Sequence, residues 1–120
     1  MSESYDLGLE GEAYAKQYFI KKGFQILAER WRFGKAELDL IVQKDKSLHI
    51  VEVKTRSDDA VQNPEEAVGF KKQKMMIEAA NEFVVSHQLD VEVQFDIMSL
   101  VLRKGEWKMN YIPDAFRPSF

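Results

Sequence analysis

The stretch AELDLIVQKDKSLHIVEVKT, residues 36–55, decides the fold. Its two halves, residues 36–43 and 48–55, are rich in Leu, Ile and Val, which favour β-strands. The polar residues 44–47 between them predict a hairpin loop. Because both halves are strongly apolar, we expect them to form neighbouring central strands of a sheet.

Outside this hairpin, the hydrophobic spacing predicts elements on both sides. A helix is expected over residues 6–22, ending at Gly23, and a strand over 24–31. Residues 63–66, Asn-Pro-Glu-Glu, are a helix-start signal upstream of the main helix over 70–87. Strands follow at about 91–102 and 107–112, joined by a Lys104-Gly105 turn. The order α-β-β-β-α-β-β predicts one α/β domain over residues 1–120, with a mixed sheet flanked by helices.

The composition of the chain excludes some kinds of site and argues against some kinds of partner. The chain has 120 residues, 45% of them hydrophobic, and no cysteine, which excludes disulfides and thiolate zinc sites. A net charge of −3 argues against coating nucleic acid through a general basic field. The positive charge is nevertheless grouped, at Arg30, Arg32 and Lys35 and at Lys71, Lys72 and Lys74. No signal peptide or apolar run of ~20 residues is apparent, so we expect a cytoplasmic protein without a membrane partner.

The pair Glu52 and Lys54 interrupts an apolar strand. Alternate residues of a strand share a face, so these two side chains should project together, about 6.6 Å apart along the chain. Burying opposite charges costs free energy unless they pair or bind an ion. For this tripeptide alone, a structural salt bridge or an edge strand with one wet face explains the pattern better than a catalytic site does, because short motifs often match by chance.

The position of Asp39 shifts the interpretation from a structural salt bridge toward a metal site. Leu38, Leu40 and Val42 should share one face of the preceding strand, and Glu37, Asp39 and Ile41 the other. Pairing through the short loop would set Asp39 opposite Glu52, where two carboxylates repel and raise each other's pKa. A divalent cation resolves the conflict, and oxygen ligands without cysteine favour Mg²⁺ or Mn²⁺ over zinc.

Three further residues have two interpretations each. Glu12 lies at the margin of the first helix's apolar face and is either a site residue or a solvated glutamate. Gln73 is either a contact to phosphate or a polar boundary residue, and Glu37 is either a site residue or a surface charge. His49 is predicted on the face opposite Glu52, and no Ser-His-Asp, P-loop or GxGxxG arrangement is apparent, so histidine-based nuclease chemistry is not expected.

The sequence resembles a known family, the YraN (UPF0102) family. The segments that carry the resemblance are Gly11-Glu12-Ala13, GKAELDLI at 34–41, VEVKTR at 51–56, PEEAV at 64–68, Lys72-Gln73 and Ala115-Phe116. They span nearly the whole chain in a fixed order. The family looks like a branch of the restriction-endonuclease-like, PD-(D/E)-x-K superfamily, and is similar in pattern to archaeal Holliday-junction resolvases.

The resemblance implies an α-β-β-β-α-β core and an endonuclease that hydrolyses phosphodiesters, with branched or structured DNA in repair or recombination as the substrate. It maps the superfamily's first-helix acid to Glu12, its metal-binding aspartate to Asp39, and its E-x-K pair to Glu52 and Lys54. It also implies that the main-chain carbonyl of Val53 completes the metal shell. One departure is Ala36, where a Gly usually precedes the acid. That substitution alters the turn but removes no proposed ligand.

The expected function is therefore a Mg²⁺-dependent nuclease. Asp39 and Glu52 would hold the ion, which polarises the phosphate and activates a water. Lys54 would orient that water or stabilise charge in the transition state, and Glu12 would order the ion's water shell or bind a second ion. Gln73 and the lysines around it, Lys71, Lys72 and Lys74, would contact the phosphate backbone. The alternative is a non-catalytic nucleic-acid or protein interaction module on the same fold. The sequence leaves open whether the substrate is DNA or RNA, whether it is branched or linear, and whether cleavage is internal or from an end. It also leaves open whether the protein is a monomer or a twofold homodimer.

Overall fold

Two helices and five strands follow one another in the predicted order. The computed structural model describes residues 3–57 and 68–118. Its elements are α1 (Glu3–Lys21), β1 (Gln25–Phe33), β2 (Ala36–Lys44), β3 (Ser47–Ser57), α2 (Phe70–Ser86), β4 (Glu92–Arg103) and β5 (Glu106–Phe116). The predicted boundaries hold within a few residues, and β5 is the strand that extends furthest beyond its prediction. The helix-start signal at 63–66 lies outside the described residues.

The strands form one mixed sheet in the order β1-β2-β3-β4-β5. All neighbours are antiparallel except β3 and β4, which are parallel because the chain between them crosses over through α2. The predicted central hairpin is confirmed, since β2 and β3 pair from Lys44 and Ser47 at the turn to Leu40 and Val51. The predicted mixed α/β class, with an α-β-β-β-α-β core, is therefore confirmed.

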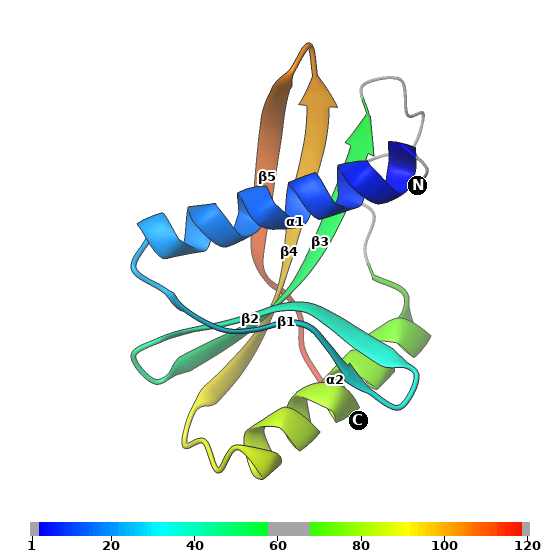
Figure 1. Cartoon of the computed structure of the whole chain (residues 1–120). Coiled ribbons are helices and arrows are strands. Elements are labelled where there is room, and N and C mark those ends of the chain that lie inside the picture. The colour runs from blue at the N-terminus through cyan, green and yellow to red at the C-terminus, as the bar shows by residue number, and fades with distance from the viewer. Residues whose placement is uncertain (1–2, 58–67, 119–120) are drawn as a thin grey trace.

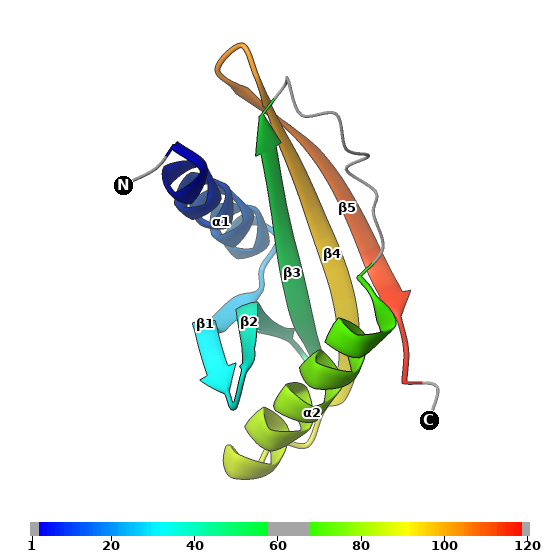
Figure 2. The ribbon, with the colours of Figure 1, turned by 90° about the vertical axis from the view of Figure 1, so that its right-hand side faces the viewer.

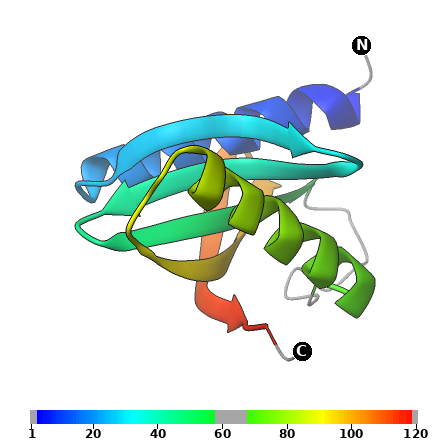
Figure 3. The ribbon, with the colours of Figure 1, turned by 90° about the horizontal axis from the view of Figure 1, so that it is seen from below.

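The two helices cover opposite faces of the sheet (Figure 2; Figure 3). Ala15 and Phe19 of α1 pack against Val51 of β3 and Met98 of β4. On the other face, α2 residues such as Phe83 pack against a second buried cluster that includes Ile50 and Ile97. Neither helix is long and apolar enough to cross a membrane, judged on the described residues.

The β1–β2 hairpin turns away from the three long strands (Figure 1). The pairing of β2 with β3 stops at Leu40 and Val51, although β2 begins four residues earlier. Leu38 belongs to the cluster under α2, whereas Leu40 and Val42 belong to the cluster under α1. The prediction that these three side chains share one face is thus wrong for Leu38. Strand alternation fixes a face only where the strand stays in the plane of its neighbours.

Helix α1 approaches β3 closely at Gly11. A Cβ added there would lie 1.9 Å from Cγ2 and 3.2 Å from Cβ of Thr55. Because Thr55 is β-branched, its side chain has few other rotamers to adopt. The lack of a side chain at Gly11 therefore sets the distance between α1 and β3. This contact is next to the site, because Gly11 precedes Glu12 and Thr55 follows Lys54.

Gly11→Ala is expected to destabilise the fold by roughly 1–3 kcal/mol, because overpacking at Thr55 outweighs the ~1 kcal/mol that alanine adds to a helix. Gly8→Ala is the matched control, since its Cβ would lie 4.0 Å from Thr55 Oγ1, an ordinary contact. Urea denaturation measures both. The double variant Gly11→Ala/Thr55→Ala should recover stability, and a Gly11→Ala protein as stable as wild type would show that the contact is not tight.

Candidate functional site

The central hairpin brings the carboxyl group of the half-buried Asp39 next to that of the buried Glu52. Asp39 and Glu52 are the next residues along β2 and β3 after the last paired residues, Leu40 and Val51. Glu52 is 4% exposed, and its carboxyl group shares a hydrogen bond with that of Asp39. Asp39 Oδ2 also accepts a hydrogen bond of 2.8 Å from the main-chain N–H of Val53. The predicted juxtaposition of the two acids is therefore what the structure contains.

The surroundings of Asp39, including the neighbouring carboxyl group of Glu52, change its pKa. Burial, then the charge of Glu52 and the hydrogen bond to it, raise the pKa of Asp39 to about 8. The hydrogen bond from Val53 opposes the rise without cancelling it. Near neutral pH, Asp39 therefore keeps its proton beside Glu52. A positive ion between the two groups would offset the charge of Glu52 and lower the pKa of Asp39.

Lys54 and the carbonyl of Val53 are placed beside the acids. Glu52 and Lys54 pair with Ile97 and Ser99 of β4, and strand alternation gives them the same face. The N–H of Val53 points toward Asp39, and the carbonyl of a strand residue points to the same side as its own N–H. That carbonyl therefore projects toward the Asp39 side, beyond the end of the β2–β3 pairing.

Glu12 reaches this neighbourhood from α1. Its pKa is raised by burial, and the guanidinium of Arg30, 3.6 Å from Glu12 Oε1, opposes that rise. Glu12 and Asp39 are close enough for the charge of Glu12 to raise the pKa of Asp39. The charge of an acid on α1 thus acts on the pair of acids that the β2–β3 hairpin brings together.

The two basic groups are arranged differently from each other. In the first, Arg30 contacts Glu12 and Arg32 donates to Glu37 over 2.9 Å, so Glu37 is engaged in a partly exposed ion pair. In the second, Lys71, Lys72 and Lys74 are all exposed at the start of α2. Lys72 differs from its neighbours because its Nζ contacts Glu52.

Gln73 lies at the beginning of α2. Its Nε2 donates a hydrogen bond of 2.7 Å to the carbonyl of Val68, which precedes the helix. Val68 is 4% exposed and belongs to the cluster under α2. The side chain of Gln73 therefore fixes the start of the helix that carries Lys72.

The acids form a small donor set for a metal. Within residues 3–57 and 68–118, no three His, Asp or Glu side chains gather closely enough to hold an ion by themselves. A cation here would rely on Asp39 and Glu52, with oxygen from the main chain and from water. That set fits Mg²⁺, which is commonly bound through one or two carboxylates and retains several waters. The raised pKa of Asp39 is the observation that supports the fit.

A second polar cluster lies on the opposite face of the sheet. His49 Nδ1 is 2.7 Å from Asp96 Oδ2, and Ser47 Oγ is 2.9 Å from His49 Nε2. The expectation from sequence that the chain holds no Ser-His-Asp arrangement is therefore wrong for the folded protein. Asp96 comes from β4, 47 residues from His49, so no local pattern could reveal the contact.

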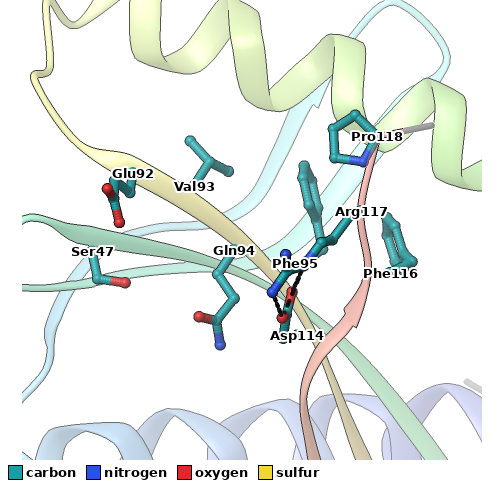
Figure 4. Close-up of a pocket in the computed structure, with 9 residues that line it drawn as sticks. All are labelled: Ser47, Glu92, Val93, Gln94, Phe95, Asp114, Phe116, Arg117 and Pro118. Carbon is teal, nitrogen blue, oxygen red and sulfur yellow. Dashed lines mark hydrogen bonds and ion pairs between the residues drawn. The ribbon is translucent and has the colours of Figure 1, made fainter. Parts of the chain in front are cut away.

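The role of this cluster is visible from the other partners of Asp96, which is 0% exposed. Its carboxylate also accepts hydrogen bonds from Tyr111 Oη, the N–H of Asp114 and the amide of Gln94. These bonds fasten β5 to β3 and β4. A pocket of about 490 Å³ beside the cluster is lined by Ser47 and Gln94 and by the Asp114–Arg117 ion pair, and shares no residue with the Asp39–Glu52 site (Figure 4).

The fold and the site together define a mixed α/β protein whose central hairpin holds two neighbouring carboxyl groups, one buried and one half-buried, beside a lysine. Comparison with known proteins then gives the family. The model of the uncharacterised protein family UPF0102 matches residues 11–100. The chain belongs to this family.

Relatives match over nearly their whole length. A UPF0102 protein of Flavobacterium psychrophilum is 42% identical over 116 residues, covering 97% of this chain and 98% of the relative. A UPF0102 protein of Bacteroides thetaiotaomicron is 40% identical over 118 residues, covering 98% of each. One from Parabacteroides distasonis is 39% identical over 116 residues, covering 97% of this chain and 96% of the relative.

Proposed function

We propose that this protein is a Mg²⁺- or Mn²⁺-dependent nuclease of the restriction-endonuclease-like kind. Its substrate would be structured DNA, and Asp39 and Glu52 would form its active site. The observation that carries the proposal is the close pair of carboxyl groups, in which burial and then the charge of Glu52 raise the pKa of Asp39 to about 8. Functional sites are where such shifts gather, because chemistry needs groups in unusual protonation states. A purely structural pair would be more stable with one acid replaced by an amide.

Each residue has a distinct task in this proposal. Asp39, Glu52 and the carbonyl of Val53 would hold a divalent ion, which when bound would polarise the scissile phosphate and lower the pKa of a water. Lys54 faces the same side as Glu52 and neutralises charge that develops on the phosphate in the transition state. Glu12 accepts hydrogen bonds from water around the acids. Lys71 and Lys74, exposed on α2, contact backbone phosphates and position the substrate.

The experiment that tests the proposal is a cleavage panel. Four-way junctions, flaps, single strands and linear duplexes of DNA, with matched RNA substrates, are incubated with the protein in Mg²⁺, in Mn²⁺ and in EDTA. We expect metal-dependent cleavage of at least one branched DNA and none in EDTA. If no substrate is cut although the protein still binds some of them, the chain is instead a non-catalytic interaction module on this fold.

Metal binding gives a second test, which does not depend on knowing the substrate. An ion that binds only the folded protein stabilises it by mass action, so Mn²⁺ at ten times its Kd should raise Tm by about 5 °C. Because the ion must replace the proton on Asp39, the rise should be larger at pH 9 than at pH 6. Thermal denaturation of wild type and Asp39→Asn checks this. Equal rises in the two proteins would place the ion at another site.

A further inference from the structure

Lys72 enters the site from a different element than Lys54. It is the third residue of α2, and its Nζ donates to Oε2 of Glu52 on β3. The Glu52 side chain is 5% exposed, whereas that of Lys72 is 56% exposed. A long side chain at the surface therefore extends inward from α2 to a buried carboxylate on β3. Figure 3 shows α2 lying across the sheet.

This contact has an energetic reason. A buried carboxylate without a positively charged partner destabilises the fold, and Glu52 lies beside a second acid. The ammonium of Lys72 supplies the positive charge that this position requires. Its neighbours Lys71 and Lys74 are also exposed at the start of α2, so the shared position on the helix does not by itself explain why Lys72 contacts Glu52.

We infer that Lys72 is a resident cation that a divalent ion must displace from Glu52, and that its released ammonium then binds the phosphate of the substrate. This rests on the proposed metal site and adds a regulation of it. When only the divalent ion is bound, the Lys72 ammonium has lost its contact with Glu52. When a phosphodiester is bound as well, its oxygens accept the hydrogen bond that Lys72 donated to Glu52. Metal and substrate should therefore strengthen each other's binding, since coupling between two ligands is reciprocal.

The inference is tested by direct Mn²⁺ titration of the full chain, measured calorimetrically, with thermal denaturation without divalent ions as a second readout. Lys72→Gln should bind Mn²⁺ about tenfold more tightly than wild type, because the competing cation is gone. The same variant should melt at a lower temperature without divalent ions, because Glu52 loses its ion pair with Lys72. Lys71→Gln removes the same charge from the neighbouring position and should change neither quantity.

Lys72→Arg is a counterpart with the opposite expectation. A guanidinium binds a carboxylate through two parallel hydrogen bonds, so this variant should hold Glu52 more firmly and weaken Mn²⁺ binding. The two variants thus move the Kd for Mn²⁺ in opposite directions from wild type. A structural role for Lys72 alone would give a lower melting temperature with unchanged or weaker Mn²⁺ binding.

The outcomes separate this inference from the proposed function. If wild type binds Mn²⁺ and Asp39→Asn does not, the metal site stands. Equal or weaker binding by Lys72→Gln then overturns the displacement alone. If wild type binds no Mn²⁺, or Asp39→Asn binds it equally well, the metal site and the displacement are both overturned.

Discussion

Asp39→Asn is expected to abolish metal-dependent cleavage and to make the fold more stable at alkaline pH. The loss of activity should be ~10³-fold or more, because the variant removes a charged ligand whose ion contributes several kcal/mol to the transition state. The gain in stability should be roughly 2 kcal/mol at pH 9, because the amide cannot ionise beside Glu52. The Asn oxygen still accepts the hydrogen bond from Val53, so the local fold should persist.

The direction of the pH effect follows from the pKa of Asp39, which is about 8 in the folded protein against an ordinary value of 3.8. Below about pH 4, Asp39 is protonated in both the folded and the unfolded state. Between about pH 4 and 8, the folded protein holds a proton that the unfolded chain has lost, so stability falls as pH rises. Above about pH 8 both states are ionised and the loss is complete.

Urea denaturation in EDTA from pH 4 to 9 measures this difference between wild type and Asp39→Asn. Glu37→Gln is the matched control, since it removes a carboxylate from the same strand, where Glu37 pairs with the exposed Arg32. That control should follow wild type in both stability and cleavage. Parallel stability curves for wild type and Asp39→Asn would mean that Asp39 ionises normally and that the two acids are not crowded.

Lys54→Ala is expected to lower the single-turnover cleavage rate by about 10²–10³-fold, which is the usual cost of removing a group that stabilises transition-state charge. Substrate affinity should hardly change, because the interaction is made mainly in the transition state. Lys71→Ala and Lys74→Ala should do the reverse. They should weaken binding and reduce its salt slope by about 0.9 for each phosphate that the variant no longer neutralises.

Single-turnover rates at saturating protein and several salt concentrations separate these roles. The substrate is whichever nucleic acid the cleavage panel identifies. Lys72 is not grouped with Lys71 and Lys74 in this comparison, because its ammonium contacts Glu52. If Lys54→Ala cleaves at the wild-type rate once saturated, the E-x-K assignment is wrong.

The part of the site that the sequence predicted is the part built by short-range rules. Asp39 and Glu52 lie on strands joined by a two-residue turn, so alternation and a tight hairpin together determine that they meet. Gly23 ends the first helix with φ +89°, as expected for a glycine after the last turn. Apolar β-branched runs likewise identify the central strands, because such residues fit a sheet that is covered on both faces.

What the sequence could not predict depends on tertiary arrangement. Leu38 changes face because β2 leaves the sheet plane near the site, a bend set by how the hairpin packs under both helices. Lys72 is one of three lysines close together in the sequence. The local sequence therefore does not indicate which of them contacts β3. The contact between His49 and Asp96 joins two strands through a parallel pairing that periodicity does not specify.

The most direct test of the central claim is to locate a bound Mn²⁺ by its anomalous scattering in crystals of the wild-type protein soaked with the ion. We predict a peak between the carboxylates of Asp39 and Glu52, within coordination distance of the Val53 carbonyl, and its loss in Asp39→Asn crystals soaked identically. A peak only at surface acids such as Asp45 or Asp90, or none at millimolar Mn²⁺, would contradict the account.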